Sequence, residues 1–398
     1  MRSCTQVPNG STVFLRTGMD VPLKEGVITD PARIEETRAT IDVLRIKGCK
    51  VVVATHLGRP KGKDASLSAK PVADYLAKHY PVTFVPAVFG SAVATAIHNA
   101  PAAGLIVIEN LRYDEREEKN DALFGKELVA WCDVIVQDAY GNAHREHASM
   151  IAALEHKPAY TGLLLEKELM MMQRLEKPDH PYVAIIGGAK ADKLSVIRGL
   201  LPKVDAIIVG GVLANTFLKA IGKPVGDSKV DDSGLAEARD LYAAAHGKIF
   251  IPVDAVVAER FAEDSPSRIL DVDVIRKGMI LDIGPKTQEM YVKRLDGART
   301  IVWGGPIGVF EWDAFAEGTR IIAVEIALSP AYTLAAGGDS GAALVKLGYK
   351  ENITHISTGG GVTLQLLEGK PLPAVQALER NEKKFAKEWN GTGADFSC

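Results

Sequence analysis

The chain has 398 residues, of which 47% are hydrophobic and 24% charged, and its formal net charge is −3. This length exceeds one typical hydrophobic core and predicts two or three domains of a globular protein. The charge excludes a strongly basic nucleic-acid-binding protein, and the sequence shows neither the apolar run of a membrane helix nor the pattern of a signal peptide. We therefore expect a cytoplasmic protein without nucleic-acid or membrane partners.

The first half alternates short Val- and Ile-rich runs with longer segments of helical period. Strands are expected in "STVFLR", "CKVVVATH", "GLIVIEN" and "CDVIVQDA". Arg and His follow these strands, in "ATHLGRP", "IENLRY" and "DAYGNAHREH". The alternation predicts a parallel sheet with helices on both faces, and such folds bind their ligands at the carboxyl ends of the strands.

A connecting helix is predicted between the halves. Apolar residues recur at helical spacing in "TGLLLEKELMMMQRLEKPDHP", and prolines end the pattern. We interpret its three consecutive methionines as helix core or a domain-facing stripe, rather than as a flexible binding surface. The last 28 residues, with "LERNEKKFAKEW", are expected to form a charged amphipathic helix followed by a tail. The predicted parts are 1–160, 161–181, 182–370 and 371–398.

Glycine-rich turns mark the second half. Strands are expected in "PYVAIIGG", "DAIIVGG", "GKIFIPVDAVV", "ARTIVWGGP", "AYTLAAGGD" and "NITHISTGGG", and glycines follow all of them except "GKIFIPVDAVV". Glycine lets the backbone approach a phosphate, and a helix that starts just afterwards adds its positive N-terminal end. Because several such turns occur together, we predict a nucleotide site. Neither a P-loop nor a dinucleotide-binding fingerprint is present.

Charged residues at the turns are the candidate ligands of anions and metal. Lys190 and Lys193 stand at the start of an expected helix, where they either neutralise phosphate oxygens or remain solvated. Asp339 either caps its helix or holds Mg²⁺. His144 and His147 have the spacing of metal ligands, but without a third ligand nearby we interpret them as part of a polar loop.

Basic residues of the first half suggest a second anion site. Each is individually a surface residue or local ion-pair partner, but together they can bind a small phosphorylated acid, because Arg forms paired hydrogen bonds with phosphate and carboxylate oxygens. These residues are Arg33, His56, Arg59, Arg112 and Arg145.

The motifs "HLGRP", "ENLR", "DAYGNAHREH", "GGAKADK", "ANTFLK", "LDIGP", "VWGGPIGVFEW", "GGDS" and "STGGG" occur in the order and approximate spacing of phosphoglycerate kinases. Over nearly its whole length the chain resembles that family. The resemblance implies two doubly wound, Rossmann-like α/β domains with parallel sheets, joined by a hinge helix. It also implies that the C-terminal segment returns to the N-terminal domain and that the protein is a monomer.

The activity implied by the resemblance is reversible phosphoryl transfer from 1,3-bisphosphoglycerate to ADP, giving ATP and 3-phosphoglycerate, with Mg²⁺. The phosphoglycerate side is implied to use Asp20, Arg33, His56, Arg59, Arg112 and Arg145. The nucleotide side is implied to use Gly187, Gly188, Lys190, Lys193, Pro306, Glu311, Gly338, Asp339 and Ser340. Arg33 and Lys190 are implied to be catalytic, Glu311 to lie near the ribose and Asp339 near the metal, and the helix N-termini at Gly338, Gly360 and Gly361 to face the transferred group.

Three departures from the family pattern put the activity in question. "RTGMDVP" stands where the family has R-x-D-x-N-x-P, so that Gly18 and Asp20 replace Asp and Asn. If this segment is a strand, Asp20 shares a face with position 18 and either replaces the missing carboxylate or repels the substrate. The two lysines are three residues apart instead of four, and Gly304 replaces an Asn. Two hypotheses follow: a working kinase, or a non-catalytic relative that binds nucleotide for a structural or regulatory role.

Overall fold

The computed structural model of the chain describes residues 1–188 and 193–386. Two compact units divide the chain. Unit 1 contains Met1–Met170 together with the described part of the segment that begins at Pro371, and unit 2 contains Met171–Lys370. Within the described residues, no helix is both long and apolar enough to cross a membrane.

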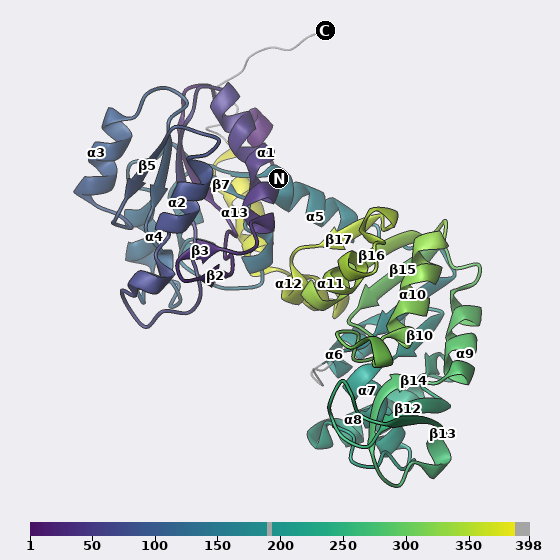
Figure 1. Cartoon of the computed structure of the whole chain (residues 1–398). Coiled ribbons are helices and arrows are strands. Elements are labelled where there is room, and N and C mark those ends of the chain that lie inside the picture. Colours follow the sequence, from purple (N-terminus) through teal and green to yellow (C-terminus); the bar gives the residue numbers. More distant parts are fainter. Residues whose placement is uncertain (189–192, 387–398) are drawn as a thin grey trace. The chain divides into compact units, whose positions relative to one another are not determined.

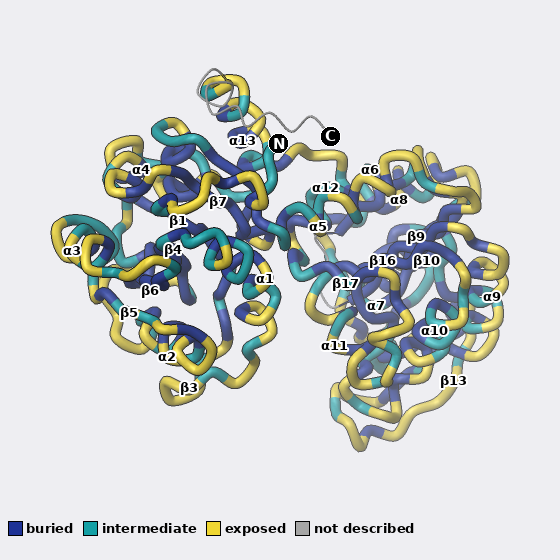
Figure 2. Tube along the Cα trace, turned by 90° about the horizontal axis from the view of Figure 1, so that it is seen from above, coloured by how far each residue is buried: buried dark blue, intermediate teal, exposed yellow. Residues whose placement is uncertain are grey.

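Unit 1 is built on a parallel sheet with the strand order β5-β6-β4-β1-β7-β8. Its strands are β1 (Thr12–Arg16), β4 (Lys50–Ala54), β5 (Val82–Val85), β6 (Leu105–Ile108), β7 (Val134–Gln137) and β8 (Ala159–Thr161). The central strands are buried almost throughout, as Figure 2 shows in dark blue. Burial on both faces explains why these strands read as continuous apolar runs rather than as alternating patterns.

Helices and short connections surround this sheet (Figure 1). The α-helices are α1 (Ala32–Ile46), α2 (Lys70–Leu76), α3 (Ser91–Asn99), α4 (Ala122–Leu128), α5 (Leu163–Gln173), which continues into unit 2, and α13 (Pro373–Lys384). Between the helices lie a hairpin of β2 (Leu23–Lys24) and β3 (Val27–Ile28) and the 3₁₀ turns η1 (Cys4–Gln6), η2 (Ala65–Leu67), η3 (Leu111–Tyr113), η4 (Tyr140–Asn142) and η5 (Ala152–Glu155).

The C-terminal helix α13 packs on unit 1, where Figure 1 draws it in yellow beside strands of the first 160 residues. Asn381 is buried at this contact. Its side chain accepts a hydrogen bond from the backbone N–H of Ala159 at 2.9 Å and donates to the carbonyls of Leu154 and Lys157 at 2.5 and 2.8 Å. One amide side chain thus fixes the helix to the end of the sheet.

Unit 2 contains a second parallel sheet, with the strand order β11-β10-β9-β15-β16-β17. The strands are β9 (Tyr182–Ile186), β10 (Ala206–Val209), β11 (Ile249–Phe250), β15 (Thr300–Gly304), β16 (Tyr332–Ala336) and β17 (His355–Ser357). The helices are α6 (Leu194–Leu200), α7 (Gly211–Ala220), α8 (Leu235–Ala244), α9 (Pro285–Leu295), α10 (Glu317–Leu328), α11 (Gly338–Lys346) and α12 (Gly360–Leu367), with the turns η6 (Asp232–Gly234), η7 (Val272–Val274), η8 (Asp313–Phe315) and η9 (Lys350–Asn352). Two parallel α/β sheets confirm the predicted fold class.

A three-stranded antiparallel sheet of unit 2 is absent from the sequence prediction. It has the order β13-β12-β14, formed by β12 (Asp254–Ala258), β13 (Ser267–Asp271) and β14 (Met279–Ile283). The prediction of a single strand in "GKIFIPVDAVV" is wrong. This run contains β11 of the parallel sheet and most of β12 of the antiparallel sheet. Pro252 lies between them, and proline cannot donate to a strand ladder.

The connecting helix is shorter than its pattern suggests. Helix α5 ends at Gln173, and the residues after it form turns before Pro178. Among the three methionines, Met172 is buried in the core of unit 2, whereas Met170 is exposed. The methionines therefore do not form one continuous buried stripe.

Candidate functional site

Basic side chains gather at the carboxyl edge of the unit 1 sheet. Arg16 ends β1, His56 follows β4, Arg112 lies on η3 after β6, and Arg145 follows η4, which comes after β7. Neighbouring parallel strands end at the same edge, which explains why residues far apart in sequence meet here. We call the surface lined by Asp20, His56 and Arg112 the anion pocket.

Asp20 lies among these basic side chains. Its Oδ1 accepts a hydrogen bond from the Gly58 N–H at 2.9 Å, and its Oδ2 lies 3.7 Å from His56 Nε2 and 4.0 Å from Arg33 Nη1. Arg33 also donates to the Asp20 carbonyl at 2.6 Å. Strand β1 ends before this segment, so the alternation argument for positions 18 and 20 is wrong; a loop, not a strand face, turns Asp20 inward.

Arg112 carries unsatisfied hydrogen-bond capacity. The side chain is buried; its Nη1 donates to the Gly58 carbonyl at 2.6 Å, and its Nε lies 3.1 Å from a Glu118 carboxylate oxygen. Nη2 is buried without a hydrogen-bond partner among the described residues. Buried donors are rarely left unpaired in native proteins, so an anionic oxygen at Nη2 would complete this side chain.

Arg16 is the residue of this site that the sequence prediction missed. Its side chain is fully buried, with Glu117 as the nearest carboxylate at 4.0 Å. Burial lowers the pKa of the Arg16 guanidinium to about 10, and Glu117 opposes that shift, so Arg16 is charged at neutral pH. The position of this arginine at the end of the apolar run "STVFLR" could have indicated a site residue. Nothing in the sequence identified Glu117 as its buried partner.

The remaining basic candidates occupy different environments. Arg33 and Arg59 are exposed, and Arg145 is partly buried, with an Nε atom that has no hydrogen-bond partner within the described ranges.

His147 is buried, and its Nδ1 lies 3.9 Å from a Glu117 carboxylate oxygen. Burial and, after it, the charge of Arg112 lower the pKa of His147 to about 3. In the part of the chain that the structure describes, no group of three or more potential metal ligands includes His144 or His147.

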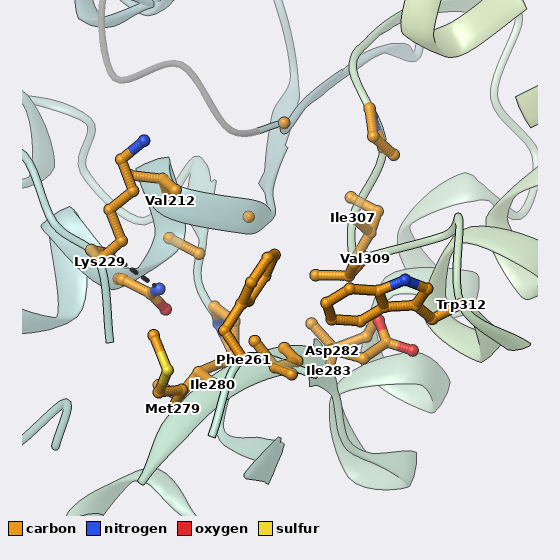
Figure 3. A pocket seen from close by; sticks show the side chains of 18 of the residues that line it. Val212, Lys229, Phe261, Met279, Ile280, Asp282, Ile283, Ile307, Val309 and Trp312 are labelled. Carbon is orange, nitrogen blue, oxygen red and sulfur yellow. Dashed lines mark hydrogen bonds between the residues drawn. The ribbon is translucent and has the colours of Figure 1, made fainter. Parts of the chain in front are cut away.

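Unit 2 contains a cavity of about 700 Å³. Its walls are the beginning of α7, strand β14 and the loop after β15. Figure 3 shows mostly apolar side chains around it, among them Phe261, Ile307, Val309 and Trp312. The Phe261 and Trp312 rings lie 4.6 Å apart between centroids. A flat aromatic or heterocyclic ring suits such a space.

Part of the predicted nucleotide set lines this cavity. Gly188, Pro306, Glu311 and Asp339 do so. Gly187, Lys193, Gly338 and Ser340 are not among the lining residues. Ser340 is buried and accepts a hydrogen bond from the Gly305 N–H at 2.7 Å, which places it behind the loop rather than on its surface. Lys190 lies outside the described residues.

Lys193 turns inward instead of toward solvent. It directly precedes α6, and its ammonium donates to the carbonyls of Gly187 and Gly304 at 2.6 and 2.9 Å. Helix α6 begins at Leu194, so Lys193 lies one residue before the helix and not within its first turn. A Cβ at Gly187 would lie 2.1 Å from the Pro306 carbonyl oxygen, so only glycine allows this packing.

Two helix N-termini lie together at the carboxyl edge of the unit 2 sheet. Helix α11 begins at Gly338 after β16, and α12 begins at Gly360 after β17. A Cβ built on Gly360 would lie 3.3 Å from the Gly337 Cα, so the two starts are in direct contact. Their N–H groups and helix dipoles favour negative charge at this position.

The cavity floor carries polar groups that the sequence prediction did not include. Asp282 on β14 is buried, accepts a hydrogen bond from the Gly318 N–H at 2.7 Å, and has an Oδ1 without a partner in the described ranges. Burial raises its pKa to about 7. Asn215 on α7 is likewise buried, and its Nδ2 donates to the Lys229 carbonyl at 3.1 Å. Asp282 lies on a strand of the antiparallel sheet, which the sequence did not predict. Helix α7, which carries Asn215, contacts that same strand.

Comparison with known proteins places the chain in a family. Residues 5–370 match the family model described as phosphoglycerate kinase. The phosphoglycerate kinase of Dictyoglomus turgidum is 44% identical over 379 residues, covering 93% of this chain and 96% of the relative. The phosphoglycerate kinase of Moorella thermoacetica is 45% identical over 379 residues, with the same coverage.

Solved structures agree with this placement. The phosphoglycerate kinase structure from Coxiella burnetii has a TM-score of 0.85 at 36% identity and covers 94% of this chain and 97% of its own. The structure from Pyrococcus horikoshii OT3 has a TM-score of 0.84 at 32% identity and covers 97% of this chain and 100% of its own. The chain therefore belongs to the phosphoglycerate kinase family, whose transferases move a phosphoryl group reversibly between 1,3-bisphosphoglycerate and ADP.

Proposed function

We propose that the chain is an active phosphoglycerate kinase that binds 3-phosphoglycerate in the unit 1 anion pocket and the nucleotide in the unit 2 cavity. The first assignment rests on Arg112, a buried arginine at the same sheet edge as His56. Its Nη2 has no hydrogen-bond partner among the described residues. A small molecule with a phosphate and a carboxylate supplies the oxygens that this pocket lacks.

In unit 1, Arg112, His56, Arg145 and Arg59 are assigned to hold the phosphoglycerate. The acceptor in the direction of ATP use is a carboxylate, which is already ionised at neutral pH. The reaction therefore needs no general base, and alignment with charge stabilisation supplies the catalysis. A pocket with a buried, hydrogen-bonded Arg112, a partly buried Arg145 and an exposed Arg59 suits that task.

In unit 2, the cavity is assigned to the base, and Glu311, at its edge, to the ribose. Asp339 is an exposed carboxylate in the first turn of α11 and lines the same cavity. Since Mg²⁺ is commonly held by one or two carboxylates together with substrate phosphates, a single Asp fits this ion. When bound with the nucleotide, the ion would neutralise phosphate charge, and Asp339 would hold it.

The transferred phosphoryl group is assigned to Arg33, Lys190 and the helix starts at Gly338, Gly360 and Gly361. Arg33 is exposed at the first turn of α1, where only one of its nitrogens is engaged by Asp20. Helix N-termini stabilise negative charge without moving during the reaction. Because the two substrates are assigned to different units, closure about α5 would bring them together and exclude water.

The proposal also takes the enzyme to be a cytoplasmic monomer. Each assigned half of the site is formed by residues of one chain, so the reaction requires no residue from a second copy. Gel filtration with light scattering measures the oligomeric state directly.

A coupled assay of ATP-dependent phosphorylation of 3-phosphoglycerate by the purified protein tests the function. We expect turnover that depends on both substrates and on Mg²⁺. In the same assay, Arg33→Ala should lower kcat strongly while leaving the KM for ATP unchanged, because Arg33 is assigned to the moving group. No turnover at saturating substrates, with nucleotide binding intact, would favour the non-catalytic alternative. An equal fall in kcat and nucleotide affinity would contradict the role of Arg33.

A further inference from the structure

We propose that Glu117 and Ser149 are positioning residues that hold Arg16 against His56 and thereby fix His56 as the neutral tautomer with its proton on Nε2. Nε2 is the nitrogen that faces the anion pocket. The inference rests on the proposed function only in naming the ligand as phosphoglycerate. The geometry of the cluster is independent of that assignment.

A buried chain of hydrogen bonds holds Arg16. Its Nε donates to the Ser149 hydroxyl at 2.7 Å, and that hydroxyl donates to Glu117 Oε1 at 2.5 Å. The backbone N–H of Ser149 donates to Glu117 Oε2 at 2.9 Å. Arg16 and Glu117 are both fully buried, so the carboxylate supplies the opposite charge that a buried guanidinium requires.

The held guanidinium selects the tautomer of His56. Arg16 Nη2 lies 3.4 Å from His56 Nδ1. A guanidinium has only N–H donors and no acceptor, so Nδ1 must offer its lone pair and the ring proton must reside on Nε2. His56 Nε2 in turn lies 3.7 Å from Asp20 Oδ2, on the pocket side of the ring.

The charges around His56 also keep the ring neutral. Burial lowers its pKa well below the ordinary value, and Arg16, Arg112, Arg145 and His147 act in the same direction. The carboxylates of the cluster are Asp20, which faces Nε2, and Glu117, which faces Arg16. The imidazole is therefore a fixed hydrogen-bond donor rather than a titrating cation, and its contribution to binding an anionic oxygen should not change with pH near neutrality.

Histidine NMR on the full-length protein measures this tautomer directly. With ¹⁵N-labelled histidine, two-bond ¹H–¹⁵N correlations distinguish protonated from unprotonated ring nitrogens, and the spectrum of His56→Gln assigns the signal. We expect Nε2 protonated and Nδ1 unprotonated, with no titration between about pH 5.5 and 8. A signal from the Nδ1–H tautomer, or a His56 that titrates near its ordinary pKa, would overturn the proposal.

Two variants test the positioning residues. Glu117→Gln keeps the side-chain shape but removes the charge, and Ser149→Ala breaks the bridge and remains informative if the first variant folds poorly. Each should move the His56 signal toward a mixture of tautomers and raise the KM for 3-phosphoglycerate roughly tenfold, with the KM for ATP unchanged. Glu115→Gln, a change at an exposed carboxylate, is the matched control and should alter neither measurement.

A folded Glu117→Gln or Ser149→Ala variant that keeps the wild-type tautomer would refute the positioning role. So would an equal rise of both KM values, because it indicates a general loss of structure. If the protein fails to phosphorylate 3-phosphoglycerate at all, the proposed function fails, whereas the tautomer measurement still decides the present inference. The two failures are therefore distinguishable.

Discussion

Asp20 places a negative charge inside a pocket assigned to an anion. Its carboxylate receives the Gly58 N–H and faces both His56 and Arg33. Two like charges about 4 Å apart repel each other by about 1 kcal/mol in water and about 4 kcal/mol at an effective dielectric of 20. Because the Asp20 side chain is 36% exposed, the lower figure applies. We therefore expect Asp20 to lower the affinity for 3-phosphoglycerate without preventing its binding.

Asp20→Asn should tighten binding of 3-phosphoglycerate. The amide oxygen can still accept the Gly58 hydrogen bond, while the repulsion of about 1 kcal/mol disappears, which corresponds to a roughly fivefold lower KM. Adding Gly18→Asp would restore the R-x-D-x-N-x-P pattern of the family, and the site has room for it, since a Cβ at position 18 meets only ordinary contacts at 3.7 Å or more. An unchanged or higher KM for 3-phosphoglycerate in the single variant would show that the Asp20 charge assists binding.

Only part of the unit 1 site could be predicted from the sequence. Residue type and position after a strand correctly predicted that His56 and Arg112 meet at one sheet edge. Sequence did not predict that Arg16 joins them, because that depends on Ser149 and Glu117, which lie far along the chain. It also assigned Lys193 to phosphate, although the ammonium is held by two backbone carbonyls whose approach requires the glycines at 187 and 305.

At the scale of elements, Asp282 joins strand β14 to the start of α10. It accepts the Gly318 N–H at the first turn of that helix. A Cβ at Gly308 or Gly318 would lie 2.2 or 2.3 Å from Asp282 Oδ1, so the loop carrying Glu311 wraps closely around this carboxyl. The buried carboxyl thus helps to set the position of the cavity wall.

Asp282 should make unit 2 less stable as pH rises. Its pKa is raised from 3.8 to about 7 by burial, so the folded state binds the proton more tightly than the unfolded state. This difference in proton affinity contributes on the order of 4 kcal/mol to the free energy of unfolding. The contribution is fully present below about pH 4 and is lost as the pH rises to about 7. Asp282→Asn keeps an acceptor for Gly318 and should flatten this dependence, raising the free energy of unfolding at pH 8.

Urea unfolding of the nucleotide-free protein at pH 5 and pH 8 measures that difference. Asp264→Asn, at an exposed carboxylate paired with Arg260, provides the control. If wild type and Asp282→Asn lose the same stability between the two pH values, Asp282 does not titrate in the assigned range.

Strands could be predicted where a short apolar run in the sequence ended in glycine or polar residues. Apolar runs followed by glycine or polar residues correctly located β1, β4, β9 and β15. The antiparallel sheet was missed because its strand β13 is exposed along most of its length and carries no apolar run, and because Pro252 interrupts what reads as one strand. The cavity residues contributed by β14 and Phe261 were therefore not foreseen.

At the scale of the whole molecule, the chain returns to its beginning. Helix α13 follows unit 2 in sequence but belongs to unit 1, and Asn381 holds it through three hydrogen bonds to the segment around β8. The resemblance implied this return, whereas the charge pattern of the segment predicted only an amphipathic helix. A contact between residues more than 200 positions apart cannot be read from local pattern.

Asn381→Ala should destabilise unit 1 by about 3 kcal/mol, because it leaves one N–H and two carbonyls without the partner that satisfied them. Urea unfolding provides the measurement. Gln376→Ala, at an exposed position of the same helix, should have little effect. A loss below about 1 kcal/mol for Asn381→Ala would show that α13 is held mainly by its apolar face.

The division of substrates between the two units is the central claim, and one set of kinetic measurements tests it most directly. In the coupled assay, Arg112→Gln in unit 1 and Asp339→Asn in unit 2 are compared with wild type at varied concentrations of each substrate. We predict that Arg112→Gln raises the KM for 3-phosphoglycerate alone and that Asp339→Asn raises the KM for MgATP alone. The opposite pairing, or an equal rise of both KM values in both variants, would contradict the assignment.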